Sequence, residues 1–125
     1  MNAIRQAQNA YGQTNHPIRT TRGTEYEAVA RITHRLKSAA ERQPFSMVEL
    51  AGAVNENREL WTLFATQVAD GDNPLPKDLR ARIFYLAEFT TQHSRKVLAR
   101  QAGTDPLIEI NTAIMRGLRD GSNAK

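Results

Sequence analysis

The sequence predicts an all-α fold, a helical bundle of four main helices preceded by a short N-terminal helix. Apolar residues recur at steps of three and four through most of the chain, as they do on the buried face of a helix. Residues that cap, begin or end helices separate these periodic stretches. No stretch alternates apolar and polar residues while being rich in Val, Ile and Thr, as a strand would.

The length of 125 residues suits one helical domain with a modest core. We expect residues 1–12 to form the short N-terminal helix, because apolar residues at helical spacing precede Gly12. Residues 13–23 should form a loop, residues 24–119 the main bundle, and residues 120–125 a frayed tail.

The first main helix is expected to begin near Thr24 and to end before Pro44. Thr24 and Glu27 match a capping box, in which the hydroxyl and the carboxylate cap each other's backbone amides. The residue before a proline disfavours helical backbone, which sets the end of the helix. Its apolar stripe comprises Tyr26, Val29, Thr33, Leu36 and Ala40.

The second main helix is expected to begin after Ser46 and to run to about Ala69. Ser46 and Glu49 form another capping-box match. Residues 70–76 should end the helix and form a loop, because a glycine suited to a left-handed helix end is followed by two prolines. The stripe of this helix comprises Leu50, Val54, Asn57, Trp61, Phe64 and Val68.

The last two helices begin at prolines, which favour the first position of a helix. The third is expected to start around Pro76 and to end near Gly103, and the fourth to start at Asp105 and Pro106. The stripe of the third comprises Leu79, Ile83, Leu86, Thr90, His93 and Val97, with Tyr85 and Phe89 beside it. The stripe of the fourth comprises Leu107, Ile110, Asn111, Ile114 and Leu118.

The formal net charge of +4 keeps nucleic acid among the possible partners. The charge is uneven, since residues 45–75 carry a single Arg against five acidic residues while both ends of the chain are basic. Runs of Lys and Arg, which would mark a phosphate-binding tail, are missing, so solvated helix faces are the favoured interpretation. The sequence has no apolar run of membrane-spanning length and no signal-peptide core, and we expect a cytoplasmic protein without membrane insertion.

Enzymatic chemistry has little support in the sequence, and we expect no catalytic residue, metal or cofactor. There is no Cys to supply a thiolate. His16, His34 and His93 stand in different segments without the spacing of metal ligands. The glycine-rich and nucleophile motifs of nucleotide-binding proteins and hydrolases are absent.

Polar residues interrupt the stripes of three successive helices, at Asn57, His93 and Asn111. Such residues either bond one another in the core and fix the helix register, or lie at the rim of a groove that accepts a partner helix. Their occurrence together, beside a wide apolar face, favours a groove. The predicted groove comprises Asn57, Leu60, Phe64, Tyr85, Phe89, His93 and Asn111, and the predicted core anchors are Trp61, Leu86 and Ile114.

Three motifs give the chain a family resemblance. They are N-x-x-L-W at 57–61, L-P-x-x-L-R-A at 75–81 and P-L-I-x-I-N-x-x-I-M-x-G-L at 106–118. In this order and spacing the sequence resembles the flagellar biosynthesis regulator FlaF family of alphaproteobacteria, over roughly residues 10–118.

The resemblance implies a small cytoplasmic helical protein that binds unassembled flagellin as a secretion chaperone, promotes its production and export, and acts opposite FlbT, a regulator of flagellin translation. A bundle with an apolar groove could cover the amphipathic segments of flagellin before assembly. The alternative is an RNA- or DNA-binding post-transcriptional regulator of flagellin expression. Its phosphate contacts would be Arg80, Arg82, Arg95, Lys96 and Arg100.

Overall fold

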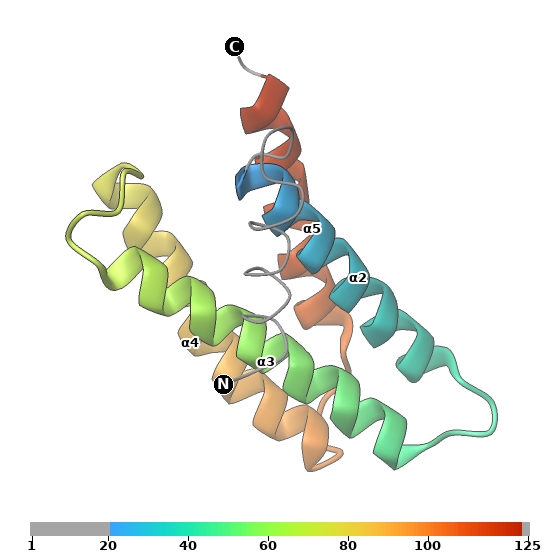
Figure 1. Ribbon diagram of the computed structural model, residues 1–125. Helices are drawn as coiled ribbons and strands as arrows, with labels where there is room; N and C mark the ends of the chain where they lie inside the picture. The colour runs from blue at the N-terminus through green and yellow to red at the C-terminus, as the bar shows by residue number, and fades with distance from the viewer. Residues whose placement is uncertain (1–20, 124–125) are drawn as a thin grey trace.

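The computed structural model describes the backbone of residues 21–123 and the side chains of residues 25–118. This part of the chain forms four α-helices and no strand (Figure 1). They are α2 (Thr21–Glu41), α3 (Met47–Ala69), α4 (Lys77–Leu98) and α5 (Asp105–Asn123). The prediction of an all-α bundle with four main helices is confirmed, while the short helix expected at 1–12 lies outside the described residues.

Helix α3 begins and ends where the sequence predicts. The backbone N–H of Glu49 donates to Ser46 Oγ at 3.2 Å, so Ser46 is the N-cap. The end of the helix does not use a left-handed glycine, because no described glycine has a positive φ. Two side chains cap the last turn instead: Asn73 donates to the Gln67 carbonyl at 2.9 Å, and Arg80 donates to the carbonyls of Val68 and Asp70.

Three other predicted boundaries are wrong. Helix α2 begins at Thr21, so Thr24 lies inside the first turn and is not its N-cap. Helix α5 continues to Asn123, so residues 120–123 are helical rather than a tail. Helix α4 ends at Leu98, five residues before the predicted Gly103.

Helix α4 ends early because Arg100 takes up the left-handed conformation, with φ 62°. The N–H of Gln101 then bonds to the Lys96 carbonyl at 2.8 Å, which is the hydrogen bond of a Schellman motif. Glycine usually occupies this position. Here the Arg100 guanidinium lies 4.3 Å from the centre of the Phe45 ring, an attraction that favours Arg at this place.

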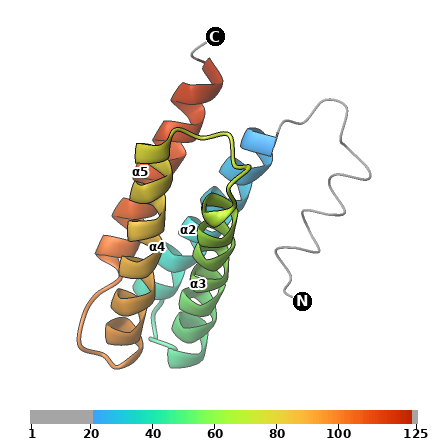
Figure 2. The same cartoon turned by 90° about the vertical axis from the view of Figure 1, so that its left-hand side faces the viewer.

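The helices associate in two antiparallel pairs. Helix α3 packs mainly on α4, and α2 packs mainly on α5, although α2 and α3 are also in contact. In Figure 1 the two pairs diverge towards the end of the molecule that holds the α3–α4 turn. In Figure 2 the four helices run side by side, so the divergence is confined to one direction.

The core consists of two clusters along the bundle. One surrounds Trp61, whose ring meets Phe64 edge-on with 5.2 Å between ring centres. The other includes Leu36, Leu50 and Leu107 and lies towards the α2–α3 turn. Each cluster contains residues of more than two helices, so neither helix pair is buried without the other.

The buried face of α4 differs from the predicted stripe. Its buried residues are Ala87, Thr90, Ser94 and Val97. Thr90 and Val97 belong to the predicted stripe, but Leu79 is 38% exposed, and Leu86 and His93 are only half-buried. The neighbouring small residues Ala87 and Ser94 point inward instead, and Ala87 packs in the cluster that contains Trp61 and Phe64.

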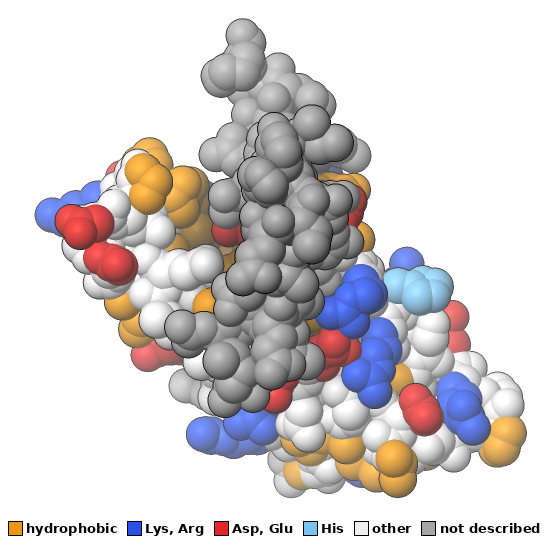
Figure 3. Space-filling model, in the orientation of Figure 1, with side chains coloured by type: hydrophobic (Ala, Val, Ile, Leu, Met, Phe, Trp, Pro, Cys, Tyr) orange, Lys and Arg blue, Asp and Glu red, His pale blue; other side chains and the backbone are white. Residues whose placement is uncertain are grey.

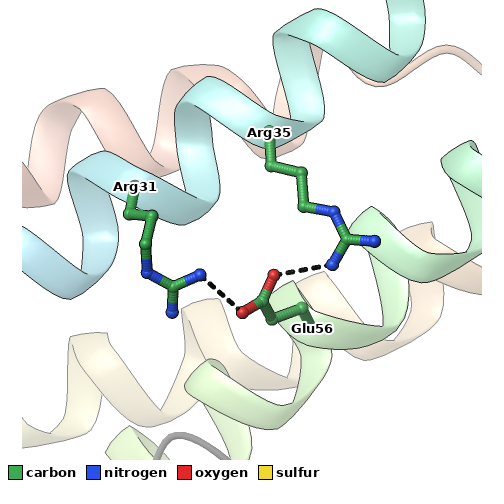
Figure 4. A network of polar contacts seen from close by, with 3 residues as sticks. All are labelled: Arg31, Arg35 and Glu56. Atoms are coloured by element: carbon green, nitrogen blue, oxygen red, sulfur yellow. Dashed lines mark hydrogen bonds and ion pairs between the residues drawn. The ribbon is translucent and has the colours of Figure 1, made fainter. Parts of the chain in front are cut away.

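An ion-pair network joins α2 to α3 (Figure 4). Arg31 and Arg35, one turn apart on α2, each donate to one carboxylate oxygen of Glu56 at 2.8 Å. Gly52 leaves room for this arrangement, since a Cβ there would lie 2.6 Å from the Arg35 guanidinium. Burial by itself would raise the pKa of Glu56, but the hydrogen bonds and charges of the two arginines outweigh it and lower the pKa below 4.5.

Candidate functional site

A chain of buried hydrogen bonds joins α3 to α5 in the middle of the bundle. The indole N–H of Trp61 donates to Asn111 Oδ1 at 2.9 Å, and Asn111 Nδ2 donates to Asn57 Oδ1 at 2.8 Å. All three side chains are at most 1% exposed. A shift of either helix along its axis would break both bonds, so these two hydrogen bonds fix the register of α3 against α5.

Four residues of the predicted groove are buried in the core, so much of this prediction is wrong. Asn57, Asn111 and Leu60 are 0% exposed and Phe64 is 8% exposed, so none of them lies at a rim that a partner could reach. Of the two interpretations of the interrupting asparagines, hydrogen bonding within the core is the correct one. Trp61 is a core anchor as predicted.

The remaining two predicted anchors, Leu86 and Ile114, are half-buried and pack against the cluster around Trp61. They therefore belong to the margin of the core rather than to its centre.

His93 has a structural role in the described part of the chain. Its Nε2 lies 2.9 Å from the carbonyl oxygen of Gly103, an acceptor, so this nitrogen carries the proton. Its ring stacks on Phe89, with 5.4 Å between ring centres. Both residues are half-buried and together hold the α4–α5 loop against α4.

Four buried polar atoms have no hydrogen-bond partner among the described residues. They are Asn57 Nδ2, Thr33 Oγ1, Thr90 Oγ1 and Ser94 Oγ. They come from α2, α3 and α4, so three of the four described helices contribute buried polar groups. Each group left without a partner costs on the order of 1–3 kcal/mol of folding free energy.

Large apolar side chains are exposed in two places, around the start of α3 (Phe45, Met47 and Val48) and on α4. Tyr85 is 65% exposed, Phe84 42% and Leu79 38%. Of the predicted groove, only Tyr85 is among these residues. Phe84 was missed, although the run Ile-Phe-Tyr-Leu at 83–86 holds more apolar residues than one helix face can bury. Figure 3 shows hydrophobic side chains on the surface at the end of the molecule formed by the α3–α4 turn.

A groove of about 380 Å³ lies between α3 and α4, next to Phe84. We call it the α3–α4 groove. Small residues provide most of its lining, with Trp61 and Phe84 as the two aromatic residues and Glu88 as the charged one. Its lining residues are Trp61, Thr62, Ala65, Thr66, Ala69, Phe84, Ala87, Glu88 and Thr91.

The cations of α4 do not gather into one patch. Arg80 is engaged by the end of α3, and Arg100 lies over Phe45. Arg82, Arg95 and Lys96 are exposed, but Arg82 and Arg95 stand roughly 140° apart around the helix axis at about 100° per residue. The predicted phosphate-binding set is therefore divided between a helix cap, an aromatic contact and separate helix faces.

The side chains of the described residues form no cluster of three or more His, Cys, Asp or Glu that could hold a metal ion. No helix in the same part of the chain combines the length and the hydropathy that a membrane span requires.

The sequence model of one protein family, flagellar protein FlaF, matches residues 7–118. Comparison with curated proteins and with solved structures gives no match.

Proposed function

Because the chain belongs to the FlaF family of flagellar proteins, we propose that it binds unassembled flagellin in the cytoplasm as a secretion chaperone. In this role it promotes the production and export of flagellin, in functional opposition to FlbT. It acts by binding and carries out no catalysis.

The observation that supports binding is the exposure of three large apolar side chains on α4, those of Leu79, Phe84 and Tyr85. Exposed aromatic residues at neighbouring positions are costly to solvate and are typical of protein interaction sites. An amphipathic segment of an unassembled subunit has an apolar face that is exposed to water before assembly. Exposed apolar residues on a helical bundle can bury this face in a complex. Ordering such a segment costs entropy, which keeps the complex reversible, as an export chaperone requires.

Co-purification and calorimetry with the flagellin of the source bacterium test the proposal. The wild-type protein should bind flagellin, and Tyr85→Asp should weaken binding at least about tenfold, because interface aromatics carry much of the binding energy. Val48→Asp is the comparison variant, since Val48 is 82% exposed and belongs to the other group of exposed apolar residues, around the start of α3; equal loss in the two variants would mean that binding is not specific to α4. The absence of measurable binding between the wild-type protein and purified flagellin would overturn the proposal.

A further inference from the structure

We propose that the α3–α4 groove seats a partner helix that presents a ridge of small residues and directs a Lys or Arg at Glu88. This assignment rests on the proposed function, for which it names the binding surface and the chemistry of the recognised segment.

The shape of the groove supports a partner helix with small residues on its contact face. Ala65 and Ala69 on α3 and Ala87 on α4 supply small side chains along its length, as do the threonines of both helices. Small residues allow a third helix to approach closely between two others. Phe84, at 42% exposure, stands beside this lining as an apolar wall. A helix with large residues on its contact face would not fit as deeply.

The charge of the groove supports a Lys or Arg on the partner helix. Glu88 lines it, and Glu59 lies on α3 one turn before Thr62, at the end of the groove where α3 runs beside the second half of α4. Neither carboxylate forms an ion pair with a side chain of the described residues, in contrast to Glu56.

No cation stands three or four residues from either carboxylate on its own helix, although Arg58 directly precedes Glu59. The positions three and four residues from Glu88 hold Phe84, Tyr85, Thr91 and Gln92. The nearest cation on the same face is Arg95, two turns away. Glu88 therefore presents a negative charge without an ion-pair partner among the described residues next to the apolar Phe84, which suits a cationic side chain at the border of an apolar helix face.

The same charges make two other occupants unfavourable. A second copy docked on the same face of this chain would bring two sets of Glu59 and Glu88 together, and like charges across an interface are repulsive. A nucleic acid would place phosphates against the carboxylates. A basic amphipathic helix meets neither obstacle.

Filling the groove tests its shape. Thr66→Trp places a large ring in the groove, whereas Thr112→Trp places the same ring on the exposed surface of α5. The two threonines are well matched, because each is exposed and bonds to the carbonyl four residues before it, Thr66 to Thr62 at 3.0 Å and Thr112 to Ile108 at 2.8 Å. We expect Thr66→Trp to weaken the binding of flagellin at least about tenfold and Thr112→Trp less than about twofold.

Reversing the charge tests the predicted cation. Glu88→Lys should weaken binding about three- to tenfold, and the control Glu109→Lys, at an exposed position of α5, should leave it unchanged. Synthetic peptides of about 25 residues that tile flagellin identify the bound segment. Replacing its Lys or Arg by Glu should abolish binding to the wild type and restore binding to Glu88→Lys.

The outcomes separate the groove from the chaperone role. If the wild type binds flagellin and Thr66→Trp binds equally well, or Thr112→Trp loses as much, the groove assignment is wrong and the chaperone role stands. If the wild type does not bind flagellin, the chaperone role fails and the groove assignment fails with it. If Thr66→Trp only abolishes self-association, the groove is an interface between copies. Should Thr66→Trp lose its far-UV helical signal, the charge-reversal pair decides.

Discussion

Trp61 and Asn111, 50 residues apart in the sequence, share a buried hydrogen bond of 2.9 Å. Two of the three motifs that carry the family resemblance therefore meet in space, since Trp61 ends the first and Asn111 lies within the third. Their meeting place is the core of the bundle, where Asn57 joins them. These two motifs consequently specify the fold, and of their residues only Trp61 also lines the α3–α4 groove.

Asn111→Leu should lower the free energy of unfolding by about 2–4 kcal/mol. The substitution leaves the Trp61 N–H and Asn57 Oδ1 unpaired in the core, and each unpaired group costs roughly 1–3 kcal/mol. Urea denaturation of wild type and variant measures the change. Thr112→Leu, next to it and exposed, should change stability by less than about 0.5 kcal/mol. A near-neutral Asn111→Leu would mean that the buried chain contributes no stability.

Thr90→Val should stabilise the protein by about 1 kcal/mol. The Thr90 side chain is 0% exposed and its hydroxyl has no hydrogen-bond partner among the described residues, so an isosteric methyl group removes a penalty at no cost in packing. Thermal unfolding should show a higher midpoint. The comparison variant Thr66→Val, whose hydroxyl is exposed and bonded, should gain nothing. A loss of stability in Thr90→Val would show that the hydroxyl is satisfied in solution.

Glu56→Gln should remove a stabilisation that depends on pH. The pKa of Glu56 is lowered in the folded protein, so the carboxylate contributes stability above its unfolded pKa near 4.5, and this contribution is lost as pH falls through the folded value. Since both arginines are substantially exposed, we expect a difference of about 0.5–1 kcal/mol at pH 7. The difference between wild type and variant should shrink in denaturant titrations as the pH is lowered below 4.5. The control Glu59→Gln, at a carboxylate without an ion pair in the described residues, should change stability at pH 7 by less than about 0.5 kcal/mol.

Arg80→Gln should destabilise the end of α3 by about 1–2 kcal/mol. Its guanidinium donates to the carbonyls of Val68 and Asp70 at 3.0 and 2.9 Å, and bonds from a charged donor are stronger than neutral ones. Hydrogen exchange of the last turn of α3 should become faster. The exposed Arg82→Gln is the control. Equal exchange in the two variants would show that Arg80 is not a cap.

A salt titration distinguishes flagellin binding from the nucleic-acid alternative. The affinity for flagellin should change only a few-fold between about 50 and 300 mM salt, because apolar burial is insensitive to salt and few ion pairs contribute. Nucleic-acid binding would weaken steeply, by roughly one power of salt concentration per phosphate contacted. Tight RNA or DNA binding with such a slope, combined with indifference to flagellin, would favour the alternative.

The helices could be predicted from the sequence wherever a local residue determines the boundary. Ser46 begins α3 and the prolines after Ala69 prevent its continuation, and neither effect needs distant contacts. The end of α4 was misplaced because the left-handed position is held by Arg100, whose partner Phe45 lies far away in the sequence.

The location of the site could not be predicted in the same way. Periodicity identifies a stripe but does not distinguish core from rim, and the partners that settle the position of Asn57 come from another helix. On α4, the sequence pattern places the larger Leu86 inward, whereas the smaller Ala87 is the residue buried in the cluster around Trp61 and Leu86 is half-buried at its margin. The buried face of α4 is therefore shifted by about one residue from the predicted stripe, and Phe84 and Tyr85 are exposed.

The pairing of α2 with α5 has a consequence for biosynthesis. A ribosome releases the chain from its N-terminus, so the α3–α4 hairpin is complete while α5 is still being made. Helix α2 can contact α3 by then, but its main packing partner is the last of the four described helices to be made. Until α5 has emerged, the nascent chain therefore exposes the apolar residues of α2 that α5 later covers.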